Sequence, residues 1–282
     1  MHTSEFAIRP MCEVLQVARS GYYDWLSGQE RRAQHKLLEQ QLLAQVREIF
    51  EHYRRYYGAR RIRYVLQSQG VKMSRRRVSQ LMKRAGLVCQ SKRKHKVTRD
   101  SEHALLRSPN VLSRGFEAKE ADVKYVGDIT YLKTVEGWLY LAVVIDLFSR
   151  RVVGWAMKAH MRASLVNEAL LMAIWQRKPK AGLIWHTDQG SQYASESHRK
   201  IIKEHGIVQS MSRKGDCWDN AVSESFFRTL KREVVMGKRF KTRREARRAI
   251  FEYIEVYYNR QRHHSSNGYL TPEEYERQDV KS

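Results

Sequence analysis

The sequence has few cysteines and no long apolar run. Its cysteines, Cys12, Cys89 and Cys217, form no closely spaced pair, so neither a disulfide framework nor a zinc module is predicted. The longest apolar stretch, residues 138–148, is interrupted by Asp146 and is too short to cross a bilayer. The first residues also lack the apolar core of a signal peptide. We therefore expect a cytoplasmic protein with reduced thiols and no membrane partner.

Acidic residues are scarce relative to basic ones. Lys and Arg number 53 against 30 Asp and Glu, which gives a formal net charge of +23 over 282 residues. This excess is larger than solubility requires and favours a polyanionic partner. The 42% of hydrophobic residues can support a real core in two domains, or in one domain with appendages, so disorder is not expected as the main state.

The first part of the chain has the apolar spacing of helices. Residues 1–30 are predicted to form a short helical segment. From Leu38 to Tyr57, apolar residues recur on one face of a long amphipathic helix. A shorter helix is predicted over residues 60–69, with Gly70 as its C-terminal stop.

A further short helix is predicted to begin after Ser74, a favourable N-cap, and to end at Gly86. It presents basic and polar residues, and the predicted DNA contacts are Arg75, Arg76, Arg77 and Gln80. Two short helices separated by a glycine turn are typical of a helix-turn-helix, whose second helix enters the major groove. The alternative is a helical hairpin with a solvated basic face. We assign residues 31–99 to this region, including a basic linker that can lie along phosphates.

An α/β domain is predicted over residues 119–236. Three strand candidates joined by short turns form an antiparallel meander: 123–133, 138–146 and 151–157. The elements that follow alternate between helix and strand: 163–177, 183–187, 195–205, 208–211 and 219–235. This is the element order of the ribonuclease H-like fold, a mixed sheet flanked by helices. Residues 237–282 are predicted to add a C-terminal helical extension, with one helix over 243–258 and another that begins at Thr271 and Pro272.

Three acidic residues stand in segments that suggest a common site. Asp128 interrupts an apolar strand, Asp188 ends another, and Glu224 lies in the helix predicted after them. An Asp within a strand is disfavoured and costly to bury alone, so a bound cation would explain Asp128. Backbone hydrogen bonds could instead explain Asp128, and loop capping could explain Asp188. Asp146, which also ends a strand, is interpreted as a turn or ion-pair residue.

Two strands and a helix can bring three carboxylates to one point. In a very basic protein, such a cluster suggests two divalent cations, Mg²⁺ or Mn²⁺, which together can activate the attacking oxygen and stabilise the leaving oxygen at phosphorus. Lys231 lies two helical turns after Glu224, close to the same face, and could bind DNA phosphate. Arg228 lies between them and could also contact DNA, although an ordinary ion pair with Glu224 is the alternative.

Four segments resemble the integrase core of bacterial insertion-sequence transposases: 127–131, 146–150, 186–193 and 219–227. The resemblance is to the downstream-frame product of the insertion sequence three family and covers essentially the whole chain. As in that family, 35 residues, 189–223, separate Asp188 from Glu224, and Lys231 follows the Glu by seven positions. Residues 57–87 resemble the family's helix-turn-helix segment. Its C-terminal signature is matched by residues 258–260 and 271–272.

The resemblance implies a DDE transposase that acts on DNA in the bacterial cytosol, in association with the nucleoid. It implies Mg²⁺-dependent hydrolysis at an element end, followed by attack of the exposed 3′-hydroxyl on another DNA strand. Asp128, Asp188 and Glu224 would bind the metal ions in both steps. Expected partners are double-stranded DNA, further copies of the chain on that DNA, and the upstream-frame product as a fusion or subunit.

Two other functions fit part of the sequence. A DNA-binding regulator of transposition with an inert integrase-like core would use the same basic helices, and metal-dependent strand joining distinguishes it from an enzyme. A ribonuclease H-type nuclease would need a fourth acid that such enzymes commonly carry, and degradation of RNA–DNA hybrids would reveal it.

Overall fold

The computed structural model describes residues 7–90, 108–213 and 220–279. The chain forms two compact units, residues 1–91 and 92–282, which are described separately. Most of the predicted basic linker, together with Cys217 and Asp219, lies outside the described residues. None of the described helices is both long and apolar enough to cross a membrane.

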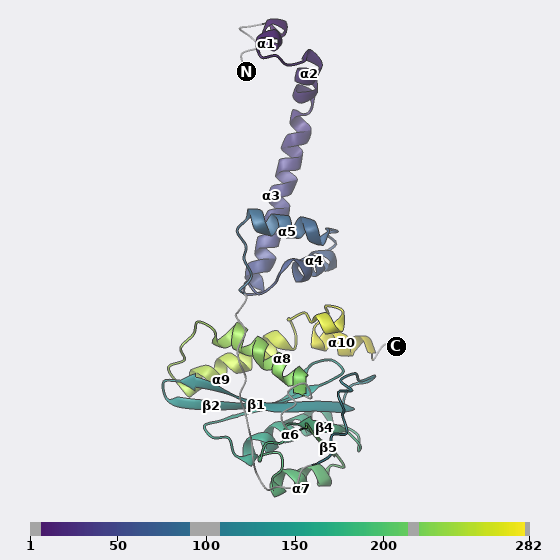
Figure 1. Ribbon diagram of the computed structural model, residues 1–282, viewed down its shortest axis with the longest axis vertical. Helices are drawn as coiled ribbons and strands as arrows, with labels where there is room; N and C mark the ends of the chain where they lie inside the picture. The colour runs from purple at the N-terminus through teal and green to yellow at the C-terminus, as the bar shows by residue number, and fades with distance from the viewer. Residues whose placement is uncertain (1–6, 91–107, 214–219, 280–282) are drawn as a thin grey trace. The chain divides into compact units, whose positions relative to one another are not determined.

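The first unit is helical (Figure 1). Its helices are α1 (Ile8–Val14), α2 (Arg19–Ser27), α3 (Gln29–His52), α4 (Ala59–Ser68) and α5 (Arg75–Arg84). The second half of α3 packs with α4 and α5 around one apolar core, which includes Val46, Ile62 and Leu81. The two short helices predicted on either side of a glycine turn are therefore confirmed.

Helix α3 ends five residues earlier than the predicted Tyr57. Arg54 and Arg55 have φ angles of 56° and 64°, a left-handed conformation that cannot continue a right-handed helix. The chain therefore turns, and Tyr57 stacks on Tyr53 with ring centroids 3.9 Å apart.

The local signals around α4 and α5 act as expected. The Ser74 hydroxyl accepts the N–H of Arg77 at 3.2 Å, as an N-cap does. Gly70 and Gly86 have φ angles of 83° and 65°, so each occupies the left-handed position that favours glycine after a helix.

A five-stranded mixed sheet forms the centre of the second unit. Its strands are β1 (Lys124–Thr134), β2 (Gly137–Asp146), β3 (Val152–Lys158), β4 (Ile184–Thr187) and β5 (Val208–Met211). Their order is β3-β2-β1-β4-β5. The first three strands pair antiparallel, and β4 and β5 add on the other side of β1 as parallel strands. The predicted meander within a mixed sheet is confirmed.

Helices cover both faces of this sheet (Figure 1). Helices α6 (Ala163–Arg177) and α7 (Glu196–Glu204) lie on one face, and α8 (Ala221–Leu230) and α9 (Arg243–Phe251) lie on the other. The apolar core beneath α6 and α7 includes Ile129, Val144 and Trp185. Gly127 makes room for Trp185, because a Cβ atom at this position would lie 2.0 Å from the indole ring.

Two predicted helices change hydrogen-bond pattern near their ends. Helix α8 continues as a π-helix, Lys231–Val235, and α9 continues as a second one, Glu252–Tyr258. A π-helical turn contains an extra residue and therefore redirects the side chains that follow. Within these segments Glu233 and Tyr253 are buried, and the Tyr253 hydroxyl donates to the Glu233 carboxylate at 2.9 Å.

The C-terminal segment is attached to the outer strand β3. The Asn259 side chain makes the two main-chain hydrogen bonds that a neighbouring strand would make. Its Oδ1 accepts the N–H of Val152, and its Nδ2 donates to the Val152 carbonyl oxygen, each at 3.0 Å. A 3-10 turn (Ser265–Asn267) and helix α10 (Pro272–Asp279) follow. Thr271 and Glu274 form the reciprocal hydrogen bonds of a capping box, which confirms the predicted helix start.

Candidate active site

Asp128 lies in β1, and Asp188 directly follows β4, the parallel strand beside it. The register between β1 and β4 pairs Val126 with His186, and continuing it by two residues brings Asp188 level with Asp128. Neighbouring strands lie about 4.8 Å apart, so the two residues are close although 59 residues separate them, 129–187. Each of the two acids thus lies two residues beyond the last paired residues of neighbouring strands.

Both aspartates accept main-chain hydrogen bonds. Asp128 Oδ1 accepts the N–H of Ile129 at 2.7 Å, and Asp188 Oδ1 accepts the N–H of Gly190 at 2.9 Å. The second bond closes a turn directly after β4, as predicted for an Asp that ends a strand. Each side chain is half-buried and therefore remains accessible to a ligand.

Glu224 lies in α8, and the buried residue Asn220 connects this helix to β1. Asn220, at the N-terminal end of α8, donates from Nδ2 to the carbonyl oxygen of Gly127 at 3.2 Å. Gly127 precedes Asp128, and Asn220 lies one helical turn before Glu224. The bond therefore fixes the start of α8 beside the strand that carries Asp128.

Burial raises the pKa of the half-buried Glu224 carboxyl, and the positive charge of Arg228 partly opposes this effect. Arg228 and Lys231 are both exposed, at the end of α8 and the start of the π-helix that follows. The Lys231 ammonium group lies 5.2 Å from the ring centroid of Tyr131 in β1. Lys231 thus contacts the same strand that carries Asp128.

Sequence reasoning missed a buried histidine that holds the end of β4. The Ser210 hydroxyl oxygen accepts the N–H groups of Val111 and Leu112, so its own proton is directed to His186 Nδ1, 2.8 Å away. His186 Nε2 lies 3.2 Å from the Ser212 hydroxyl oxygen, so both ring nitrogens have serine partners. Its position two residues before Asp188 is the only sequence signal of this role.

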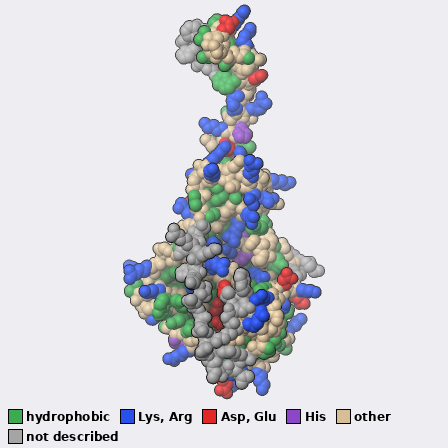
Figure 2. Space-filling view, in the orientation of Figure 1, with side chains coloured by type: hydrophobic (Ala, Val, Ile, Leu, Met, Phe, Trp, Pro, Cys, Tyr) green, Lys and Arg blue, Asp and Glu red, His purple; other side chains and the backbone are tan. Residues whose placement is uncertain are grey.

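The three carboxylates do not form a compact metal-binding group in the structure. Among the described residues, no three His, Cys, Asp or Glu side chains are placed to hold one ion. Figure 2 shows acidic side chains on this face of the unit, with Lys and Arg side chains near them.

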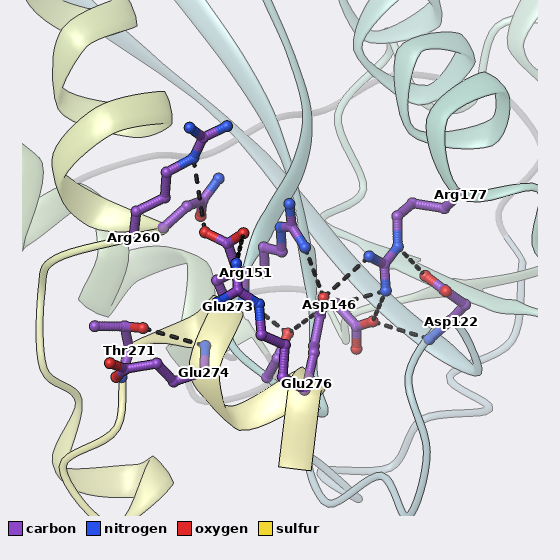
Figure 3. A network of polar contacts seen from close by, with 12 residues as sticks. Asp122, Asp146, Arg151, Arg177, Arg260, Thr271, Glu273, Glu274 and Glu276 are labelled. Carbon is purple, nitrogen blue, oxygen red and sulfur yellow. Dashed lines mark hydrogen bonds and ion pairs between the residues drawn. The ribbon is translucent and has the colours of Figure 1, made fainter. Parts of the chain in front are cut away.

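Asp146 has the structural role predicted for it. Its buried carboxylate accepts the N–H groups of Asp122 and Phe148 at 2.9 and 2.8 Å. Arg177 lies 4.0 Å away and also bonds Asp122 and Glu276, so Asp146 belongs to the network that attaches α10 (Figure 3). Burial raises the pKa of Asp146 to about 7, although its hydrogen bonds from the main chain lower it.

The predicted DNA contacts on α5 differ in their surroundings. Arg75, Arg76 and Gln80 are exposed. Arg77 is half-buried and forms an ion pair with Glu39 of α3 at 2.8 Å, and Arg84 binds the same carboxylate. Arg77 therefore has a role within the unit in addition to any contact with DNA.

Comparisons with known proteins match both units. Family models described as "Integrase core domain" match residues 118–217 and 224–280, and one described as "HTH-like domain" matches residues 37–95. The integrase catalytic core of HTLV-2 aligns with a TM-score of 0.43 and 16% identity, over 57% of this chain and 99% of that one.

Two bacterial relatives align over almost their full length. Transposase InsF for insertion sequence IS3A of Escherichia coli is 43% identical over 279 residues, which cover 99% of this chain and 97% of the relative. The IS600 31 kDa protein of Shigella sonnei is 42% identical over 93% of this chain and 96% of its own length. The chain therefore belongs to the IS3 family of insertion-sequence transposases, enzymes of DNA transposition with an integrase-like catalytic core.

Proposed function

We propose that this transposase cuts DNA at the ends of an insertion sequence and joins those ends to target DNA, with Asp128, Asp188 and Glu224 as its catalytic residues. The observation that carries the proposal is the register that brings Asp188 level with Asp128, beside the helix end that Asn220 ties to Gly127. This arrangement supports a site to which residues far apart in the sequence contribute their acids.

The donor set of this site fits magnesium. Asp128, Asp188 and Glu224 offer only carboxylate oxygens, the hard ligands that Mg²⁺ and Mn²⁺ prefer, and all three are partly accessible. Two such ions, when bound, would supply activation of the attacking oxygen and neutralisation of the leaving oxygen.

The two reactions follow one scheme. In the first, a water oxygen attacks phosphorus at the element end, the bond from phosphorus to the 3′-oxygen breaks, and a 3′-hydroxyl is left. In the second, that hydroxyl attacks phosphorus in the target, and the target's own 3′-oxygen leaves. Lys231 and Arg228 are proposed to bind phosphates beside the reacting one, and Arg75, Arg76, Arg77 and Gln80 are proposed to contact the duplex.

We also propose that the chain acts as a multimer on DNA, with the upstream-frame product as a fusion or subunit. The N-terminal helices support a protein partner, because several of their large apolar side chains are exposed. Trp25 of α2 is 48% exposed, and Leu37 and Leu38 of α3 are 57% and 53% exposed. Loss of association after Leu37 and Leu38 are replaced by Ser would support this interface, and unchanged association would argue against it.

The catalytic proposal is tested by strand joining. Duplex oligonucleotides taken from the DNA that borders the coding region are incubated with the full chain and Mg²⁺, and joined products are counted. We expect Asp188→Asn to abolish joining while DNA affinity stays the same or rises slightly, since a negative charge is lost. Glu196→Gln, an exposed acid at the start of α7, is the control and should retain activity. Joining by Asp188→Asn would contradict the catalytic assignment of Asp188, and absence of joining by the unaltered chain would favour the regulator hypothesis.

A further inference from the structure

An aromatic and cationic patch lies on the hairpin formed by β1 and β2, a few residues beyond Asp128. We define the hairpin patch as Tyr131, Lys133, Trp138 and Lys231, all of which are exposed. Tyr131 and Trp138 are 43% and 44% exposed, although large aromatic side chains are usually well buried. Their ring centroids lie 5.0 Å apart in an edge-to-face arrangement.

The strand register places these side chains on one face of the hairpin. Tyr131 pairs with Tyr140 across β1 and β2, and Lys133 pairs with Trp138, so all four point to the same side. Tyr140 is half-buried and packs against the core, and its ring lies 6.4 Å from that of Tyr131. Tyr131 therefore has a partly buried aromatic neighbour on the same face of the hairpin.

Positive charge surrounds the two rings. The Lys231 ammonium group lies over Tyr131, and Lys133 is the direct neighbour of Trp138. Arg243 donates to the Trp138 carbonyl oxygen at 3.0 Å, and its own N–H is accepted by Glu136, the acid of the hairpin turn. The cations can bind the phosphates of a nucleotide, and the exposed aromatic rings can stack on its base.

The hairpin patch and the Asp128 side chain lie on opposite faces of β1. Side chains alternate along a strand, so Asp128 and Tyr131 point to opposite faces, about 10 Å apart along β1. Strand β4 ends at Thr187, and no described strand pairs with β1 on that side between Asp128 and Lys133. This open edge lets Lys231, from the helix of Glu224, reach the ring of Tyr131.

We infer that the hairpin patch binds an unpaired nucleobase of the DNA substrate, stacked on Tyr131 or Trp138, within a few nucleotides of the reacting phosphate. A base within a duplex is stacked on both faces, so it must leave the duplex to stack on Tyr131 or Trp138. The inference rests on the proposed function in that the acids mark where the DNA is cut.

The test compares binding of two DNA probes by the full chain without metal. One probe is a blunt duplex, and the other carries a three-nucleotide unpaired overhang. We expect Tyr131→Leu with Trp138→Leu to reduce the preference for the overhang on the order of tenfold, because stacking is lost. The control is Trp175→Leu, an exposed Trp on α6 that is 72% accessible, which should leave the preference unchanged. Tyr131→Phe with Trp138→Phe should retain it.

Crosslinking to the unaltered chain gives a second readout that needs no variant to fold. With 5-iodouracil in the overhang, irradiation should attach DNA to the tryptic peptides 125–133 or 134–150, which contain Tyr131 and Trp138. Crosslinks elsewhere, or no overhang preference, would overturn the inference. If the Leu variant loses affinity for both probes equally, the patch contacts duplex DNA. If its self-association changes, the patch is a protein interface. Either result also overturns the inference. Because neither assay needs cleavage, failure of the catalytic proposal leaves this test intact.

Discussion

Asn220 donates a hydrogen bond from its side-chain amide to the main-chain carbonyl oxygen of Gly127, 3.2 Å away. This buried bond joins the first turn of α8 to the residue before Asp128. It therefore sets the position of Glu224 relative to the strand that carries the first aspartate.

Replacing Asn220 by Ala should lower strand joining by about 10- to 100-fold, because a misplacement of about 1 Å at a catalytic group can cost about 100-fold in rate. Joining is measured with metal and DNA in excess, and thermal unfolding is measured in parallel. Thr229→Ala, which removes a hydrogen bond to Ser225 later in the same helix, is the control. If Asn220→Ala loses stability but joins DNA normally, the bond has only a structural role.

Glu233 and Arg262 form a buried ion pair between the π-helix after α8 and the C-terminal segment, with nitrogen–oxygen distances of 3.1 to 3.2 Å. Burial alone would raise the pKa of Glu233, but Arg262 and the Tyr253 hydroxyl bring it below its ordinary value. Glu233→Gln leaves the Arg262 charge uncompensated, so the free energy of unfolding should fall by about 3–5 kcal/mol.

A double substitution separates charge from packing at this pair. Replacing both Glu233 and Arg262 by Met removes both buried charges, so denaturant unfolding should show less destabilisation than for Glu233→Gln. A double variant that is at least as destabilised as the single one would mean that shape, not charge compensation, is the main contribution.

Asp146 should make the stability of the fold depend on pH. Its pKa in the folded chain is about 7, whereas an unfolded Asp titrates near 4, so between these values the folded state holds a proton that the unfolded state has released. Raising the pH through this range therefore weakens folding. Thermal unfolding from pH 4 to 8 should show Asp146→Asn gaining stability relative to the unaltered chain as pH rises. The exposed control Glu168→Gln should show no such trend; a constant difference for Asp146→Asn would contradict the assignment.

The arginines of α5 should contribute unequally to DNA binding. Arg75 and Arg76 are exposed, so replacing both by Ala should weaken binding and reduce the slope of log affinity against log salt by about 0.9 per lost phosphate contact. Arg77→Ala should have a smaller effect because Glu39 already binds its guanidinium group. Fluorescence anisotropy at several salt concentrations measures both. An equal loss for Arg77→Ala would mean that the ion pair gives way to DNA.

Elements that depend on local spacing could be predicted from the sequence. Helix α6 has the predicted bounds, Ala163–Arg177, because its apolar repeat and its flanking turns are all local. The π-helical ends of α8 and α9 could not be predicted in this way. The π-helix after α8 places Glu233 opposite Arg262, which is 29 residues away in the sequence. Such a partner can be identified only in the folded chain.

The same distinction applies to the candidate site. Asp128 and Asp188 could be identified as candidates from the sequence because acids are unusual at such positions in apolar strands. Asn220 and His186 do not, since a buried amide or imidazole is defined by its partners: the Gly127 carbonyl oxygen for one and two serine hydroxyls for the other. Those partners come from other strands and loops, so their roles appear only in three dimensions.

The central claim is that three acids distant in the sequence hold metal ions at one place. Iron(II) substituted at such a site, with ascorbate and peroxide, generates radicals that cut the nearby main chain. We expect cuts close to Asp128, Asp188 and Glu224 together, suppressed by excess Mg²⁺ and lost from all three places in Asp128→Asn. Cuts near only one of them, or cuts that persist in that variant, would contradict a shared metal site.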